Sequence, residues 1–125
     1  DRVIAGIYAA RARQEAVRLN RQGDYDRARA FSSEALTIYQ TIGDRRGEGA
    51  DLGNLALAYA DLGDLLAAID FSEQALPIAR EIGERSYEGI ALTALGGCLA
   101  KVGALEAARE RLTEARTLLA EIGEL

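Results

Sequence analysis

Small and apolar residues recur along the chain at alternating steps of three and four, the spacing of one face of an α-helix. The clearest stripe lies near the C-terminus and consists of Leu105, Ala108, Leu112, Ala115, Leu119 and Ile122. An earlier stripe with the same intervals consists of Leu65, Ala68, Ser72, Ala75, Ala79 and Ile82. No segment alternates apolar and polar residues as a strand does. The pattern therefore predicts an all-α protein.

These stripes repeat with a period of forty residues. Identical residues agree in all three copies in five columns, which are Gly23, Gly63 and Gly103; Gly43, Gly83 and Gly123; Ala28, Ala68 and Ala108; Ala35, Ala75 and Ala115; and Ile42, Ile82 and Ile122. We expect the glycines to form left-handed caps at helix ends, because glycine adopts positive φ without steric cost. Asp24 and Asp64 follow two of these glycines and are expected to cap the next helix. Each unit is therefore predicted to be helix, tight turn, helix.

The pattern places six helices near residues 3–22, 25–42, 46–62, 65–82, 86–102 and 105–122. They form one domain, 1–125, whose repeats span about 3–42, 46–82 and 86–122. Pro77 falls inside the fourth helix, where proline removes a backbone hydrogen bond. We expect a bend there, with a break at Leu76 as the alternative.

The run from Asn54 to Asp64, together with Ala68 and Ala75, resembles the tetratricopeptide repeat. Units of that family have roughly 34 residues. The forty-residue unit is similar to the longer repeats of polarity adaptors that bind spindle proteins, of kinesin light chains and of bacterial regulators with tetratricopeptide tails, and residues 43–48 resemble the inter-repeat loop of the bacterial arrays. The resemblance implies an α-solenoid of three helix-turn-helix repeats in a right-handed superhelix, acting as a protein-interaction scaffold.

Composition narrows the function classes. The net charge of −5 argues against a nucleic-acid partner, and the longest uncharged stretch, Gly89 to Ala100, is too short for the roughly 20 apolar residues of a membrane span. We therefore expect neither nucleic acid nor membrane as a partner. The single cysteine, Cys98, excludes an internal disulfide and favours a cytoplasmic location. The chain begins at Asp1 without Met or a signal pattern, so we expect a fragment of a larger regulatory protein.

Catalytic chemistry is not indicated. The chain has no histidine, which removes the usual general base and the imidazole metal ligand, so we expect no enzyme activity, metal site or cofactor. Cys98 is interpreted as a small buried hydrophobe within the fifth helix. Gly96 and Gly97 follow a helical pattern and are interpreted as packing glycines rather than a phosphate loop. Carboxylates are expected mainly at helix starts and on outward faces.

The two ends of the repeat array differ. Arg111 and Arg116 stand where the other copies have Phe and Leu, which predicts a polar cap at the last helix. At the first helix, apolar residues are expected to be exposed and to favour self-association; they are Val3, Ile4, Ile7 and Tyr8.

The leading hypothesis is a module that binds a protein or peptide segment on its concave face; the alternative is a structural spacer or self-association array without a ligand. On the third predicted helix, some residues face away from the core, and a shift by forty residues gives their equivalents in the other two units. Together these positions predict a binding groove of Arg13, Gln14, Val17, Arg21, Gly53, Asn54, Leu57, Asp61, Thr93, Gly97 and Lys101. The charged members give this face a balance of +2, so an acidic segment is expected, held by Asn54 and Arg13.

Overall fold

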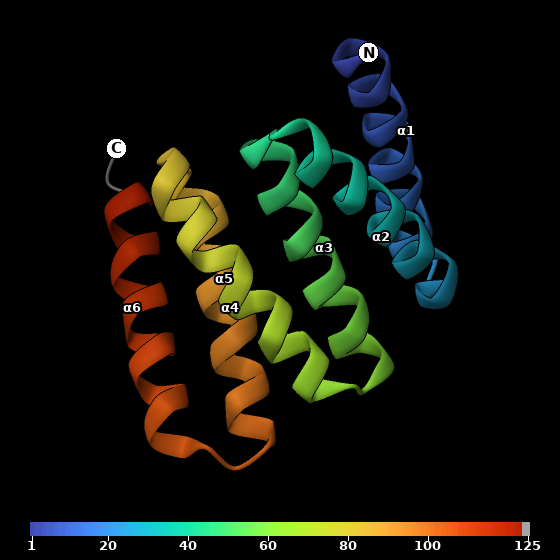
Figure 1. Ribbon diagram of the computed structural model, residues 1–125. Coiled ribbons are helices and arrows are strands. Elements are labelled where there is room, and N and C mark those ends of the chain that lie inside the picture. The colour runs from blue at the N-terminus through green and yellow to red at the C-terminus, as the bar shows by residue number, and fades with distance from the viewer. Residues whose placement is uncertain (124–125) are drawn as a thin grey trace.

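The computed structural model describes residues 1–123 and contains six α-helices within that range (Figure 1). They are α1 (Arg2–Arg21), α2 (Tyr25–Ile42), α3 (Arg45–Leu62), α4 (Leu65–Ile82), α5 (Arg85–Lys101) and α6 (Leu105–Gly123). Every boundary lies within one residue of the predicted one. The predicted domain also includes Glu124 and Leu125, which lie outside the described residues.

Each helix packs against the next one along the chain, and α3 also contacts both α1 and α5. Figure 1 shows the helices following one another from α1 at one end of the molecule to α6 at the other. The first helices of the pairs therefore form one layer and the second helices another. The fold is all-α, with the described helices arranged as three helix-turn-helix repeats.

Helix ends follow the predicted signals. Asp24 and Asp64 accept hydrogen bonds from backbone amides of the helices they precede, and Asp44 does the same at α3. Gly63 ends α3 with φ of 85°, a left-handed conformation that a side chain would strain. Four further glycines also have positive φ: Gly23, Gly43, Gly83 and Gly103.

The cap prediction is wrong at Gly123. This residue is the last one of α6 and does not have the left-handed φ of the other five glycines.

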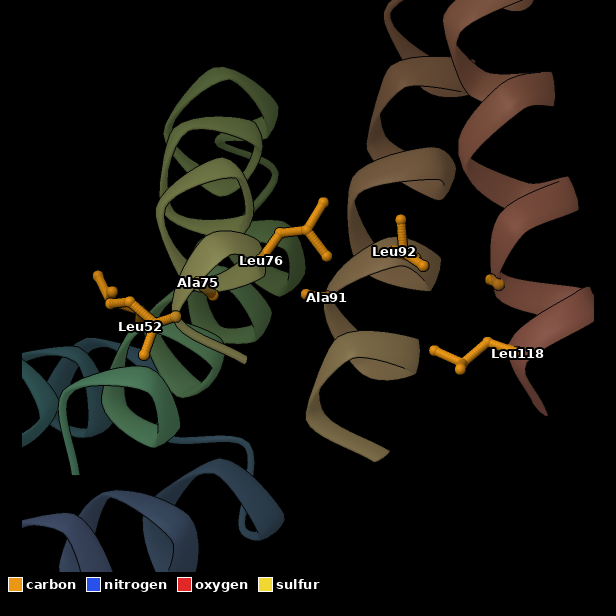
Figure 2. Close-up of a cluster of buried hydrophobic side chains, with 8 residues drawn as sticks. Leu52, Ala75, Leu76, Ala91, Leu92 and Leu118 are labelled. Atoms are coloured by element: carbon orange, nitrogen blue, oxygen red, sulfur yellow. The ribbon is translucent and has the colours of Figure 1, made fainter. Parts of the chain in front are cut away.

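The core runs through the stack between the two layers. The columns of identical alanines are buried, with Ala28 and Ala68 at 0% exposure and Ala108 at 3%, so the paired helices approach closely. A cluster of apolar side chains from α3, α4, α5 and α6 joins the second and third repeats, and Figure 2 shows Leu52, Leu76 and Leu92 within it. A smaller cluster, which includes Tyr39, joins α1 and α2.

Helix α4 passes through Pro77 without interruption, so the alternative of a break at Leu76 is wrong. Pro77 is exposed, whereas Leu76 beside it is buried in the core. The packing of the apolar stripe on both sides of the proline outweighs the lost hydrogen bond. The bend stays a prediction.

The apolar stripe of α6 is less buried than the pattern suggests. Leu105, Leu112 and Leu119 are 68%, 40% and 48% exposed, because α5 is the helix that α6 packs against among residues 1–123. The buried leucine is Leu118 instead. Arg111 is half-buried and pairs with Glu114 at 3.0 Å, but the polar-cap interpretation remains a prediction.

The apolar end predicted for α1 is exposed. Val3 and Tyr8 keep 72% and 61% of their surface open, and Ile4 and Ile7 keep about half. Of the described helices, none is both long and apolar enough to cross a membrane.

Candidate functional site

The layer formed by the first helices of the pairs, which we call the inner layer, carries a cavity of about 520 Å³ between α1, α3 and α5. Small residues of α3 form its floor, together with Ala75 from α4. We call this cavity the groove. Its lining consists of Arg13, Gln14, Val17, Arg18, Arg21, Gly49, Ala50, Gly53, Asn54, Leu57, Ala75, Tyr87, Ile90 and Ala91.

Seven of the residues expected on the concave face line the groove. They are Arg13, Gln14, Val17, Arg21, Gly53, Asn54 and Leu57. The other four lie outside its lining, namely Asp61, Thr93, Gly97 and Lys101. The structure thus gathers the expected residues of the first two units except Asp61, and the third unit contributes Tyr87, Ile90 and Ala91 instead of the expected residues.

The groove crosses the helices obliquely, which explains the replacement. The last lining residue is Arg21 on α1, Leu57 on α3 and Ala91 on α5. In the forty-residue register, Leu57 corresponds to Val17. Ala91 corresponds to Arg11, so each later helix meets the groove nearer its N-terminal end. A strict shift by forty assumes that every unit lines the groove at the same position along its helix. In the structure this position moves towards the N-terminal end from one repeat to the next.

One wall of the groove is cationic. It consists of Arg13, Arg18 and Arg21, all on α1, and the lining found within residues 1–123 includes no carboxylate. Arg18 is engaged by Glu15, which lowers the pKa of that carboxyl group. Arg13 and Arg21 form no ion pair with any residue that the structure describes. Two guanidinium groups are therefore free to bind an anion.

The opposite wall is apolar and partly open to solvent. Leu57 is 44% exposed and Ile90 is 51% exposed, with Tyr87 beside them in the lining. At Gly53, a Cβ atom would meet nothing within 4 Å, so the α3 backbone is accessible there. The groove therefore combines a charged wall, an apolar wall and an approachable backbone.

The two adjacent glycines of α5 behave differently. A Cβ atom at Gly96 would lie 2.7 Å from Leu112, so Gly96 is a packing glycine. Gly97 has nothing within 4 Å, and its interpretation as a packing residue is wrong because its side faces open space.

Asp51 is a buried carboxylate that the sequence interpretation missed. It is 0% exposed, and neither of its oxygen atoms finds a hydrogen-bond partner within residues 1–123. Burial raises its pKa to about 7, and the nearby charge of Arg13 opposes that rise. A signal was present in the chain, since Asp51 lies four residues before Leu55 and seven before Ala58, both buried.

Neither the cysteine nor the possible metal-ligating side chains indicate a reactive site. Cys98 is buried as predicted, and burial raises the pKa of its thiol above the usual range, which disfavours the nucleophilic thiolate. Within the part of the chain that the structure describes, no three His, Cys, Asp or Glu side chains gather in a way that could hold a metal ion.

Stacked helix pairs with a groove along one layer are the architecture of a helical-repeat protein. The tetratricopeptide repeat family model matches residues 8–81 and 50–121, so this chain belongs to the tetratricopeptide repeat family. No curated protein matches the chain.

Solved structures of other tetratricopeptide domains share the fold. The chain is similar to the tetratricopeptide domain of Arabidopsis FLU, with a TM-score of 0.85 and 20% identity over 97% of this chain and 99% of that one. It is also similar to the C-terminal tetratricopeptide-containing domain of a putative FK506-binding protein from Plasmodium falciparum. There the TM-score is 0.82 and the identity 24%, over 96% of this chain and 82% of that one.

Proposed function

We propose that this chain is a non-catalytic interaction module that binds an extended acidic segment of a protein or peptide in the groove. Family membership supports the general part of this proposal, because tetratricopeptide repeat domains are generally protein-interaction modules. The observation that carries the specific part is the cationic wall of α1. Three arginines line the groove on a protein whose net charge is −5, so the local charge opposes that of the whole molecule.

The two walls suggest how a ligand is held. Arg13 and Arg21 donate charge-assisted hydrogen bonds to carboxylates, which are stronger than bonds between neutral groups. The Asn54 amide pairs with the ligand backbone, which approaches α3 over Gly53. Apolar side chains of the ligand pack against Leu57 and Ile90. The preferred ligand therefore alternates acidic and apolar residues.

The wider setting belongs to the same proposal. We place the chain in a larger regulatory protein of the cytoplasm, supported by the resemblance of residues 43–48 to bacterial repeat loops and by a single, buried cysteine. The two similar solved structures support the fold alone at their level of identity.

The test uses a fluorescein-labelled hexapeptide of alternating glutamate and leucine, measured by fluorescence anisotropy. The Arg13→Ala, Asn54→Ala double variant is expected to bind it at least tenfold more weakly, because one lost charge-assisted hydrogen bond corresponds to roughly 1.5–3 kcal/mol. Arg109→Ala is the matched control, since Arg109 is exposed on α6 and outside the groove lining. A glutamine-leucine hexapeptide tests the need for negative charge.

A folded double variant that binds the peptide as wild type does, or equal binding of both peptides, contradicts the groove proposal. The spacer and self-association hypothesis then stands. The exposed apolar residues at the start of α1 favour that second candidate, with another copy of this chain as the partner.

A further inference from the structure

Three residues of the groove lining lie at steps of four along one face of α1. They are Arg13, Val17 and Arg21, and they present a guanidinium group, an apolar side chain and a second guanidinium group in that order. Residues four apart on an α-helix share a face and advance by about 6 Å, so the two arginines leave the backbone about 12 Å apart. This stripe therefore has two charged ends and an apolar centre.

Arg18 does not supply a free charge at the centre. It follows Val17 in the chain, but its guanidinium group is held by the carboxylate of Glu15 and also donates a hydrogen bond to the side chain of Gln22. The two outer arginines have no ion-pair partner among residues 1–123. The cations available to a ligand are therefore the outer ones, with an apolar side chain between them.

An extended chain has nearly the same interval as this stripe. In a β-strand, every second side chain points to the same side and lies about 6.6 Å from the previous one. We propose that the ligand of the groove lies extended along α1 and carries two acidic residues four positions apart, with an apolar residue midway between them. This inference deepens the proposed function and rests on it, because it specifies the ligand of the same groove.

Other spacings of the two acids fit the arginines less well. Acids two positions apart in an extended chain are separated by about 6.6 Å, roughly half of the distance required. Acids three or five positions apart point to opposite sides, so one of them turns away from α1. Acids six positions apart are separated by about 20 Å, which is too far. A spacing of four gives about 13 Å, within reach of two flexible arginine side chains.

The ligand residues between the motif positions point towards the opposite wall. Leu57 and Ile90 lie there, 44% and 51% exposed, so the intervening residues should also be apolar. Helix α3 contacts both α1 and α5 and lies between the two walls. The ligand backbone therefore passes over α3 at Gly53, where a Cβ atom would meet nothing within 4 Å.

The floor of the groove favours an extended ligand over a helical one. Asn54 is half-buried in the lining, next to the accessible backbone of Gly53. A helical ligand pairs its own backbone groups internally and would leave the Asn54 amide without a backbone partner. An extended ligand has free N–H and C=O groups, which the amide can both accept from and donate to.

The test compares three peptides of identical composition and charge. Glu-Leu-Val-Leu-Glu carries the motif, Val-Leu-Glu-Leu-Glu has its acids two positions apart, and Glu-Leu-Leu-Glu-Val has them three apart. Each is amidated and carries fluorescein on a Gly-Ser linker for anisotropy measurements. The motif peptide is expected to bind wild type at least tenfold more tightly than either isomer, because each isomer brings only one carboxylate to an arginine.

Two variants change the stripe itself. Arg21→Ala should remove the preference, because all three peptides then place one carboxylate on Arg13; Arg21 is exposed, so the core is not disturbed. Val17→Arg adds a cation at the centre and should raise the affinity of Val-Leu-Glu-Leu-Glu to that of the motif peptide. Arg109→Ala, on α6 and outside the groove lining, is the control and should keep the wild-type preference.

The outcomes separate the motif from the proposed function. The glutamate-leucine hexapeptide contains glutamates four positions apart and is expected to bind. If it binds but the three isomers bind equally, or their ranking survives Arg21→Ala, the motif is overturned and the groove function stands. Tighter binding of a helix-forming nonapeptide with glutamates eight positions apart overturns the extended conformation. If neither the hexapeptide nor the isomers bind, the proposed function fails and the motif fails with it.

Discussion

Gly47 is the residue at which the close approach of α2 and α3 depends most on a missing side chain. A Cβ atom there would overlap the ring of Tyr39, which is only 3% exposed and has no room to move. Gly47→Ala is therefore expected to destabilise the protein by about 1–3 kcal/mol, the cost of overpacking a core. Urea unfolding followed by circular dichroism measures the change.

Gly53 on the same helix is the matched control. A Cβ atom there meets nothing, so Gly53→Ala should stabilise the protein by up to about 1 kcal/mol through helix propensity. Equal effects of the two substitutions would mean that Tyr39 does not pack on Gly47 in solution.

Asp51 makes stability depend on pH in a direction that is unusual for a carboxylate. Its pKa of about 7 in the folded protein lies above the value of about 3.9 expected when unfolded, so the folded state binds the extra proton between these values. The contribution of Asp51 to the free energy of unfolding is therefore fully present below about pH 4 and is lost as the pH rises through 7. The loss amounts to at most about 4 kcal/mol.

Asp51→Asn should remove that loss. Urea unfolding at pH 5 and pH 8 is expected to show a strongly stabilised variant at pH 8 and a smaller gain, of roughly 1.5 kcal/mol, at pH 5. A variant that gains equally at both pH values would show that the carboxyl group does not titrate in this range.

At the residue scale, one cause explains why the sequence did not predict some residues near the site. Periodicity shows which face of a helix a residue occupies but not how deeply neighbouring helices cover it. Asp51 has the same position in its repeat as Arg11, which is exposed, and Ala91, which is buried. The charge of Asp51 predicts an exposed side chain, whereas the structure buries it completely.

At the level of single helices, α3 and α5 begin at equivalent positions of their repeats but differ in whether the N-cap side chain accepts a hydrogen bond. Asp44 accepts a hydrogen bond of 3.0 Å from the amide of Gly47, whereas Glu84, forty residues later, makes no such bond. Asp44→Ala should cost about 1 kcal/mol, the usual contribution of an N-cap, and should lower the melting temperature.

Glu84→Ala serves as the comparison. Glu84 forms an ion pair of 2.7 Å with Arg46, which is more than half exposed, so its removal should cost less than the loss of the Asp44 cap. If Glu84→Ala lowers the melting temperature as much as Asp44→Ala, the difference in capping has no energetic weight.

The helices were predictable because several local signals agree at each boundary. At the turn after Leu62, a left-handed glycine and a capping aspartate follow one another, Gly63 and Asp64, and both are used as expected. The groove was predictable only in part, because its oblique course depends on how each repeat is rotated against the previous one. That rotation arises from contacts between helices of successive repeats, such as that of Gly47 with Tyr39, and no single segment encodes it.

For the whole molecule, each repeat is stabilised by its neighbours, so the outer surfaces of α1 and α6 differ from every internal one. The face of α1 that carries Ile7 corresponds, in the forty-residue register, to the face of α3 that carries Gly47 and packs on α2. Ile7 itself is 52% exposed. A second copy of the chain is the partner expected to cover this face.

We therefore expect a mass above that of the monomer in light scattering at high protein concentration, falling on dilution. Ile7→Glu should abolish this association, because it introduces a charge into the apolar contact. Leu66→Glu, on α4, is the control: Leu66 is 75% exposed but lies away from both end surfaces, so its substitution should leave the association unchanged. A wild-type protein that remains monomeric at all concentrations, or equal dissociation by both substitutions, would exclude α1 as the contact.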